Sequence, residues 1–496
     1  MSDSVSRVVV LGQDASLWLA ASVIQAGLAP AGVAVEVVAL PSAIDASHVH
    51  ATQPALEALH NMLRISEANL LRATRGSFSL GQRFVDAAET QPAFFHAYGA
   101  HGAPIDGQEF LAFWLKARHH GLAAGFGDFG LTTAAALNGR MLLPDADTEL
   151  FGRTDYGYHL PAAAYARSLR ALVTQDGMAV HEAAGVQVEK REDGSIAALL
   201  LEDGRRIAGD LFVDASEAGV LIGEMPGTDW RSTRDIFPAD RVLRARGPRM
   251  RSLPAYGQVV ATDWGWVSLH PSQEQTHLVA AFSTDTAEEK IFDRLPSLCG
   301  FVPTEISLSA PDPGQRSAPW VANCAAIGPA AARFDPLHGA DLLGVQLGLV
   351  HLLSRFPATA EFAAERSDYN AAMARLLDRV RDFQAAHYRL ARYAGGFWDR
   401  ARTSPCAPAL AHKIDTFAAR GQLAMLEDES FPVDSWHALF LGHGLIPANW
   451  PPAIDRIAPE RMRTEFRRML GFIKDKVLAQ PLHDRYLADL QPTRPR

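Results

Sequence analysis

The 496-residue sequence has little cysteine. Its three cysteines, Cys299, Cys324 and Cys406, are far apart and odd in number, so they provide neither a disulfide framework nor the ligand spacing of a zinc site. No apolar run reaches the ~18 residues that a membrane-spanning helix needs. The N-terminal stretch enters a predicted strand with no cleavable signal before it. We therefore expect a cytoplasmic protein with no metal site and no membrane segment.

The chain also lacks an excess of basic residues. Its 47 Lys and Arg residues are outnumbered by 56 Asp and Glu residues, which gives a formal net charge of −9. A nucleic-acid-binding protein would need a basic face, so this class is excluded. The length exceeds that of one compact core and predicts two or more packed modules.

The first forty residues have the pattern of a nucleotide-binding α/β unit. Residues 7–12 predict a strand that ends in glycine, residues 15–28 a buried helix and residues 34–40 a second strand. Further strands are predicted within residues 184–214 and 256–282. From about residue 360 onward the pattern is helical. The fold class is therefore α/β, with an interleaved β-sheet and a helical C-terminal part.

The turn after the first strand departs from a dinucleotide-binding turn. Such a turn uses three glycines, and here only Gly12 is present, followed by Gln13, Asp14, Ala15 and Ser16. Ala15 is small enough to replace a glycine. Asp14 would repel a pyrophosphate, by about 1 kcal/mol at ~4 Å in water and more when partly buried. The second strand ends in Ala39, where an acidic residue would bind the ribose. A second interpretation is a helix that Asp14 or Ser16 merely caps.

Several separated motifs share their order and spacing with one family. They are Trp264-Gly265-Trp266, the segment from Trp320 to Gly328, Pro336-Leu337, Arg381-Asp382-Phe383, His387-Tyr388, Phe397-Trp398 and the turn Gly442-His443-Gly444. Together they resemble the flavin-dependent tryptophan halogenases over residues 7 to about 450. The resemblance implies an FAD-binding, flavin monooxygenase-like module over residues 1–355 and a helical substrate module over residues 356–496.

The resemblance also implies a reaction. In this family reduced FAD, supplied by a separate flavin reductase, reacts with oxygen, and a halide then yields hypohalous acid. A lysine near the aromatic substrate carries the halogen, and a glutamate assists at the ring. The FAD-binding residues implied by the resemblance are Gly12, Gln13, Asp14, Ala15, Ser16, Ala39, Gly328 and Asp341. The small aromatic substrate and the reductase are the implied partners, and a homodimer is compatible with the family.

The two residues implied to be catalytic are replaced. Ser79 stands at the position of the lysine, and a hydroxyl cannot form a haloamine. His338 stands at the position of the glutamate, where it is either a general base or a histidine that only bonds its surroundings. The halide would be held by the backbone amides of Ala340 and Asp341 at a helix N-terminus, but the Asp341 carboxylate could repel an anion there.

His96 and Tyr98 match a segment that lines the substrate pocket of the family, and the alternative is an aromatic cluster of the core. For Trp264 and Trp266 we favour packing. Three functions stay open. The first is a flavin-dependent, halogenase-like oxidoreductase, either a monooxygenase or a halogenase, acting on an aromatic or indole-type substrate. The second is a non-catalytic binding protein that has lost the FAD and halide sites, and the third is a true tryptophan halogenase with rearranged catalytic residues.

Overall fold

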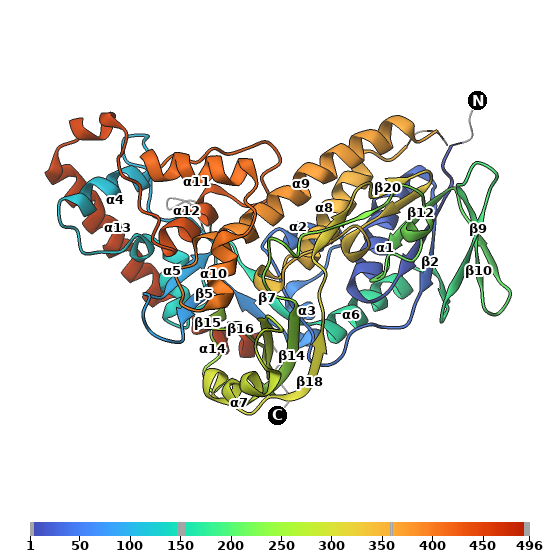
Figure 1. Ribbon diagram of the computed structural model, residues 1–496, viewed down its shortest axis with the longest axis horizontal. Coiled ribbons are helices and arrows are strands. Elements are labelled where there is room, and N and C mark those ends of the chain that lie inside the picture. Colours follow the sequence, from blue (N-terminus) through green and yellow to red (C-terminus); the bar gives the residue numbers. More distant parts are fainter. Residues whose placement is uncertain (1–3, 146–147, 149–153, 358, 360, 491–496) are drawn as a thin grey trace. The chain divides into compact units, whose positions relative to one another are not determined.

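The structure is a computed structural model that describes residues 4–145, 148, 154–357, 359 and 361–490. Internal contacts divide the chain into two units, each made of three separate segments. The helices and strands of both units are labelled in Figure 1. Unit 1 comprises Met1–Arg75, Leu160–Arg234 and Asp312–Arg379. Unit 2 comprises Gly76–His159, Asp235–Pro311 and Val380–Arg496. The expected modules 1–355 and 356–496 describe a different division and stay a prediction.

Unit 1 contains the predicted nucleotide-binding sheet. Its six strands have the order β20-β21-β12-β1-β2-β8, and β1 is parallel to both neighbours, with Leu11 opposite Val38 on one side and Asp214 on the other. The bounds are β1 (Arg7–Gly12), β2 (Ala34–Ala39), β8 (Ala179–Glu182), β12 (Leu211–Ala215), β20 (Trp320–Val321) and β21 (Cys324–Ala326). The predicted first strand, helix and second strand are confirmed, because α1 spans Asp14–Leu28 between β1 and β2.

The remaining elements of unit 1 pack around this sheet. Helix α1 contacts α6 and α8, and an apolar cluster that includes Val9, Phe212 and Ile196 fills the core. Asn323 joins the β9-β10-β11 ribbon to the sheet edge: its side chain accepts a hydrogen bond from the Ile196 amide at 2.8 Å and donates one to the Ile196 carbonyl at 2.9 Å. The bounds are α2 (Leu56–Met62), α3 (Glu67–Thr74), α6 (Ala162–Gln175), α8 (Asp341–Ser354), β3 (Val49–Ala51), β9 (Val186–Lys190), β10 (Ile196–Leu201), β11 (Arg206–Ala208), β13 (Trp230–Ser232), β19 (Gly314–Arg316) and β22 (Ala332–Arg333).

Unit 2 is built on a seven-stranded sheet with the order β18-β14-β17-β16-β15-β5-β6. The strands predicted within residues 256–282 are confirmed as β15 (Gly257–Thr262), β16 (Gly265–Pro271) and β17 (Gln275–Phe282). Leu243, Val267 and Leu278 form a core together with Ile291 and Leu295 of α7. The other strands of this sheet are β5 (Gly81–Asp86), β6 (Phe94–Ala97), β14 (Arg241–Pro248) and β18 (Thr304–Ser309). Strands β4 (Ser77–Ser79) and β7 (Gly157–Pro161) pair with each other outside it, and the last two residues of β7 belong to unit 1.

The C-terminal part is helical, as the sequence predicts. After α9 (Ala363–Leu390), which crosses the division between the units, follow α10 (Gly396–Thr403), α11 (Pro408–Arg420), α12 (Val433–Gly442), α13 (Pro459–Ala479) and α14 (His483–Asp489). Unit 2 also contains α4 (Phe110–His119), α5 (Leu131–Leu137) and α7 (Glu288–Cys299). Among the described residues, no helix combines the length and the apolarity needed to cross a membrane.

Candidate functional site

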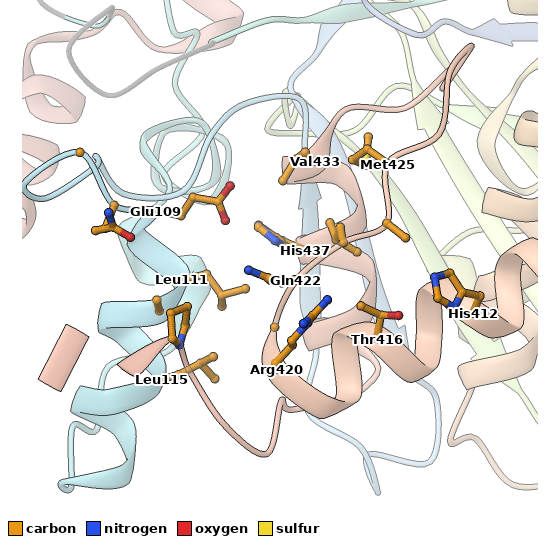
Figure 2. A pocket seen from close by; sticks show the side chains of 17 residues that line it. Glu109, Leu111, Leu115, His412, Thr416, Arg420, Gln422, Met425, Val433 and His437 are labelled. Carbon is orange, nitrogen blue, oxygen red and sulfur yellow. The ribbon is translucent and has the colours of Figure 1, made fainter. Parts of the chain in front are cut away.

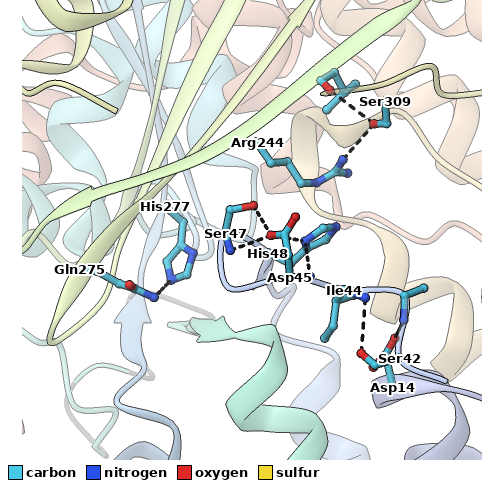
Figure 3. A network of polar contacts seen from close by, with 12 residues as sticks. Asp14, Ser42, Ile44, Asp45, Ser47, His48, Arg244, Gln275, His277 and Ser309 are labelled. Carbon is cyan, nitrogen blue, oxygen red and sulfur yellow. Dashed lines mark hydrogen bonds and ion pairs between the residues drawn. The ribbon is translucent and has the colours of Figure 1, made fainter. Parts of the chain in front are cut away.

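The turn after β1 places a residue other than glycine in a backbone conformation that favours glycine. Asp14 has a φ of 53°, a left-handed conformation that favours glycine and costs another residue of the order of 1 kcal/mol. Its carboxylate accepts hydrogen bonds from the Ser42 hydroxyl at 2.6 Å and the Ala43 amide at 2.9 Å, in the loop that follows β2 (Figure 3). Asp14 therefore connects two loops at the carboxyl edge of the sheet. Neither Asp14 nor Ser16 caps α1 by a side-chain hydrogen bond, so the capping interpretation is wrong.

Gln13 makes a similar connection on the other side of β1. Its side-chain carbonyl accepts a hydrogen bond from the Glu217 amide at 3.4 Å, in the loop that follows β12. In a dinucleotide-binding unit the pyrophosphate approaches the backbone of this turn and the N-terminus of the helix. Here two side chains bonded to neighbouring loops lie at this approach, Gln13 and the negatively charged Asp14. The turn does not fit the pyrophosphate of FAD.

The other residues assigned to FAD have structural reasons to be present. A Cβ atom at Gly12 would lie 2.5 Å from the carbonyl oxygen of Ala215, so the pairing of β1 with β12 already requires glycine there. Gly328 has a φ of 54°, and its Cβ would lie 2.7 Å from Val345 and 3.5 Å from the Ser16 hydroxyl. Ala15 is buried. Packing alone thus explains Gly12, Gly328 and Ala15.

Ala39 lies at the end of β2, beside a shallow hollow of 340 Å³. The neighbouring strand places Glu182 opposite Ala39. Its carboxylate forms an ion pair with Arg170 at 2.5 Å. The acidic residue opposite Ala39 is therefore already paired.

His338 ends a short 3₁₀ turn, Pro336–His338, that Asp335 begins by accepting the Leu337 amide at 3.0 Å. The His338 side chain is 0% exposed, and its carbonyl oxygen accepts a hydrogen bond from Gln53 at 2.8 Å. Gly339 follows with a φ of 60°, where a Cβ would lie 2.3 Å from the Ala51 carbonyl oxygen. The turn is fixed by packing within unit 1.

The halide position expected at the start of α8 carries a negative charge. Ala340 is the residue before the helix and is buried, while Asp341 is its first residue and is exposed. A carboxylate in the first helical turn is stabilised by the free amides and the helix dipole. The same amides would have to bind the halide, so Asp341 competes with an anion for them.

Asp214, at the end of β12, bonds the loop that follows it. Its buried carboxylate accepts hydrogen bonds from the amides of Leu221 at 2.7 Å and Ile222 at 2.9 Å, and from the hydroxyl of Ser216 at 2.6 Å. Burial raises the pKa of Asp214 above its ordinary value, against the effect of these hydrogen bonds. Its role in unit 1 is to hold the loop 216–222.

Ser79, for which the resemblance implies the lysine position, belongs to unit 2. It ends β4, is 2% exposed and donates its hydroxyl to the Gly81 carbonyl at 3.1 Å. Ser79 pairs with Gly157 across the β4–β7 ladder. The side chain is therefore short, buried and bonded to backbone. His338 belongs to unit 1 and Ser79 to unit 2.

His96 and Tyr98 lie together, with ring centroids 5.9 Å apart, and both are buried. The ring of His96 also contacts Phe383 and His387 of α9. This arrangement supports the aromatic-core interpretation, and a role in substrate binding stays a prediction.

The two tryptophans of the Trp264-Gly265-Trp266 motif are packed inside unit 2. Trp264 joins the core cluster beneath α7 and meets Phe282 edge-on. Trp266 is 0% exposed and donates its indole N–H to the Tyr388 hydroxyl at 2.9 Å. Both are core residues, as we favoured from the sequence.

A cavity of 510 Å³ lies between α4, α11 and α12 of unit 2, and no sequence motif marked it (Figure 2). Glu109 lies on the α4 side, Arg420 on the α11 side, and His437 and Gln422 project between them. Leu111, Leu115, Met425 and Val433 provide apolar walls. We call this space the charged cavity.

His437 is the buried polar residue of the charged cavity. It is 5% exposed, and no hydrogen bond to its ring is present among the described residues. Burial, together with the neighbouring His101, lowers its pKa to about 3. At neutral pH it is therefore an uncharged imidazole that can donate one hydrogen bond and accept another. Within the described ranges, no group of three His, Cys, Asp or Glu side chains is placed to hold a metal ion.

Comparison with known proteins defines the class. The tryptophan halogenase family model matches residues 7–459, so the chain belongs to this family. Tryptophan 6-halogenase SttH of Streptomyces toxytricini is 26% identical, over 96% of this chain and 97% of the relative. Among solved structures, the flavin-dependent halogenase BrvH from Brevundimonas sp. BAL3 superimposes with a TM-score of 0.92 at 29% identity, covering 98% of this chain and 99% of BrvH. Xcc4156, a flavin-dependent halogenase from Xanthomonas campestris, gives 0.91 at 28% identity, covering 99% of each chain.

Proposed function

We propose that this protein is a non-halogenating member of the tryptophan halogenase family, which binds a small aromatic zwitterion in the charged cavity and does not use FAD. The observation that carries the proposal is the buried Ser79 hydroxyl, bonded to Gly81 at the position where the resemblance implies the lysine. A neutral hydroxyl offers no amine to carry an electrophilic halogen.

No other lysine is placed to substitute. The sequence has six, Lys116, Lys190, Lys290, Lys413, Lys474 and Lys476. Lys116 donates to the Ile454 carbonyl at 2.9 Å, and Lys413 is buried, paired with Glu429 and 4.1 Å from the centre of the Trp436 ring. Three more form ion pairs, with Glu224, Asp263 and Asp145. The last, Lys474, is exposed on α13. A lysine held in an ion pair stays protonated and is a poor nucleophile.

The loss of FAD rests on Gln13 and Asp14, whose side chains connect the turn to the loops after β2 and β12. Opening the turn for a pyrophosphate would break these bonds and place two like charges together. Family membership implies FAD and a separate reductase, and the first function that the sequence left open, a flavin-dependent oxidoreductase, requires both.

The charged cavity supports the ligand class. A carboxylate at Glu109 suits an ammonium group, the Arg420 guanidinium suits a carboxylate, and the apolar walls suit a ring. An aromatic amino acid of the indole type combines these features. The names of the related tryptophan halogenases agree with this class.

The test has two parts. FAD is titrated into the purified protein while flavin fluorescence is followed, and we expect no quenching up to millimolar FAD. L-Tryptophan is then titrated by calorimetry, and we expect binding that weakens in Arg420→Gln but not in the matched control Arg467→Gln, an exposed arginine on α13. Tight FAD binding would contradict the proposal and support a flavin-dependent oxidoreductase. If Arg420→Gln binds tryptophan as tightly as the parent protein, the charged cavity is not the tryptophan site.

A further inference from the structure

A second hollow in unit 2, of 640 Å³, lies beside β6 and contains more positive charge than the charged cavity. We call it the arginine groove. Three arginines line it, Arg83 from β5, Arg118 from α4 and Arg392 from the segment after α9. Its aromatic walls are Phe94, Trp114 and Phe126.

The arginines of this groove are not neutralised. Among the described residues, none of the three forms an ion pair with a carboxylate. Arg83 bonds the neutral side chain of Gln258 at 3.5 Å, and Arg118 lies over the Trp114 ring at 5.5 Å. The one acidic residue of the lining, Asp128, accepts the Gly125 amide at 2.8 Å. Three cations against one anion leave a positive site on a protein with a net charge of −9.

The glycines of the Gly442–Gly444 turn allow the Phe94 ring and the Arg392 guanidinium to approach its backbone closely. A Cβ atom at Gly442 would lie 2.2 Å from the Phe94 ring, and one at Gly444 would lie 2.4 Å from the Arg392 guanidinium carbon. Any other residue at either position would displace the aromatic ring or the cation from the groove. The turn therefore packs Phe94 and Arg392 directly on the backbone at one wall.

The groove also contains buried polar atoms without partners. His101 and Thr133 line it and are each 5% exposed. Neither His101 Nδ1 nor the Thr133 hydroxyl has a hydrogen-bond partner within the described residues. Both atoms are enclosed, and an unsatisfied buried polar group costs about 1–3 kcal/mol, so a shift of this wall that lets a ligand hydrogen-bond them would be favourable.

We propose that the arginine groove is a binding site for a small aromatic anion, a ring that carries a carboxylate or a phosphate. The ring would lie against Phe94, Trp114 and Phe126, and the anionic group would be held by the guanidinium groups. This site is separate from the charged cavity and takes a different ligand, because its three arginines outnumber its one carboxylate, Asp128. This binding site does not depend on whether the chain uses FAD.

The test titrates the full-length protein with 2-naphthoate and with phenyl phosphate by calorimetry, using 2-naphthol and inorganic phosphate as ring-only and charge-only probes. We expect an aromatic anion to bind, with roughly tenfold weaker binding in each of Arg118→Gln and Arg392→Gln, since each loses a charge-assisted contact. The preference between the two anions identifies the acidic group.

Controls separate this site from the charged cavity. Arg420→Gln and the exposed Arg467→Gln should leave naphthoate binding within twofold of the parent protein, and circular dichroism checks that each variant is folded. Absence of binding at millimolar naphthoate would overturn the proposal, as would equal binding of naphthol or a loss caused by Arg420→Gln instead of the groove variants.

Discussion

Trp266 on β16 donates its indole N–H to the hydroxyl of Tyr388 on α9, and the two groups are 2.9 Å apart and fully buried. Tyr388 stacks on Trp398, whose indole N–H reaches the Thr262 carbonyl at 2.6 Å. Three of the short motifs that carry the family resemblance therefore meet in one cluster of unit 2. Their shared spacing reflects the packing of a helix and a helical turn on a sheet.

Removal of the Tyr388 hydroxyl should therefore destabilise the protein without affecting ligand binding. In Tyr388→Phe the buried Trp266 N–H loses its acceptor, and we expect a loss of about 1–3 kcal/mol in the free energy of unfolding. Urea denaturation measures it. In a Trp266→Phe background the same change should cost much less, because the bond is already absent. Equal costs in both backgrounds would show that the hydrogen bond contributes nothing.

The turn after β1 should regain cofactor affinity when its side chains are removed. In the double variant Gln13→Gly with Asp14→Gly, the bonds to Ser42, Ala43 and Glu217 are lost and glycine takes up the φ of 53° without strain. We expect measurable FAD quenching in this variant. Asp14→Asn is the matched control, since it removes the charge but keeps a side chain. Recovery by Asp14→Asn alone would assign the obstruction to charge instead of space.

Acid should destabilise the protein through its buried histidines. Burial lowers the pKa of His270 to about 3 and, with Arg392 adding to the effect, that of His443 to about 3. In the unfolded chain a histidine binds its proton below about 6.5, whereas the folded form stays neutral, so the unfolded state binds more protons between pH 6.5 and 3. The contribution of these histidines to the free energy of unfolding is therefore fully present above pH 6.5 and is lost as the pH falls toward 3.

Each such histidine should contribute a slope of about 1.4 kcal/mol per pH unit in this range. Urea midpoints measured between pH 7 and 4 test the slope. His270→Gln, which cannot titrate, should reduce it, while replacement of the exposed His412 should leave it unchanged. A profile that is flat from pH 7 to 4 would contradict the burial of these rings as neutral groups.

Much of the fold was predictable from local patterns, and the site was not. The strand, helix and strand of residues 7–39 could be placed because hydrophobic periodicity reports burial directly. The arginine groove and the charged cavity could not, since Arg83 and Arg392, like Glu109 and Arg420, come together only through tertiary packing. The hydrogen bonds of Gln13 and Asp14 were not predictable either. A missing glycine indicates that a nucleotide-binding turn has changed, but it does not show which loops the replacing side chains contact.

Introducing the lysine and the glutamate that the resemblance implies at positions 79 and 338 should not produce halogenation. Ser79→Lys places an ammonium where the side chain is 2% exposed, and His338→Glu places a carboxylate where it is 0% exposed. Burying either charge is costly unless it finds a partner, so each single variant should be destabilised by several kcal/mol. Ser79→Met, a neutral side chain of similar length, separates the cost of charge from that of size.

The double variant would still have Asp341 at the first turn of α8 and Asp14 at the turn after β1. Incubated with reduced FAD, oxygen, bromide and tryptophan, it should therefore give no bromotryptophan by mass spectrometry, and neither should the parent protein. A brominated product from the parent would refute the role assigned to Ser79. A product from the double variant alone would show that Gln13, Asp14 and Asp341 do not obstruct the reaction, and that positions 79 and 338 suffice to control it.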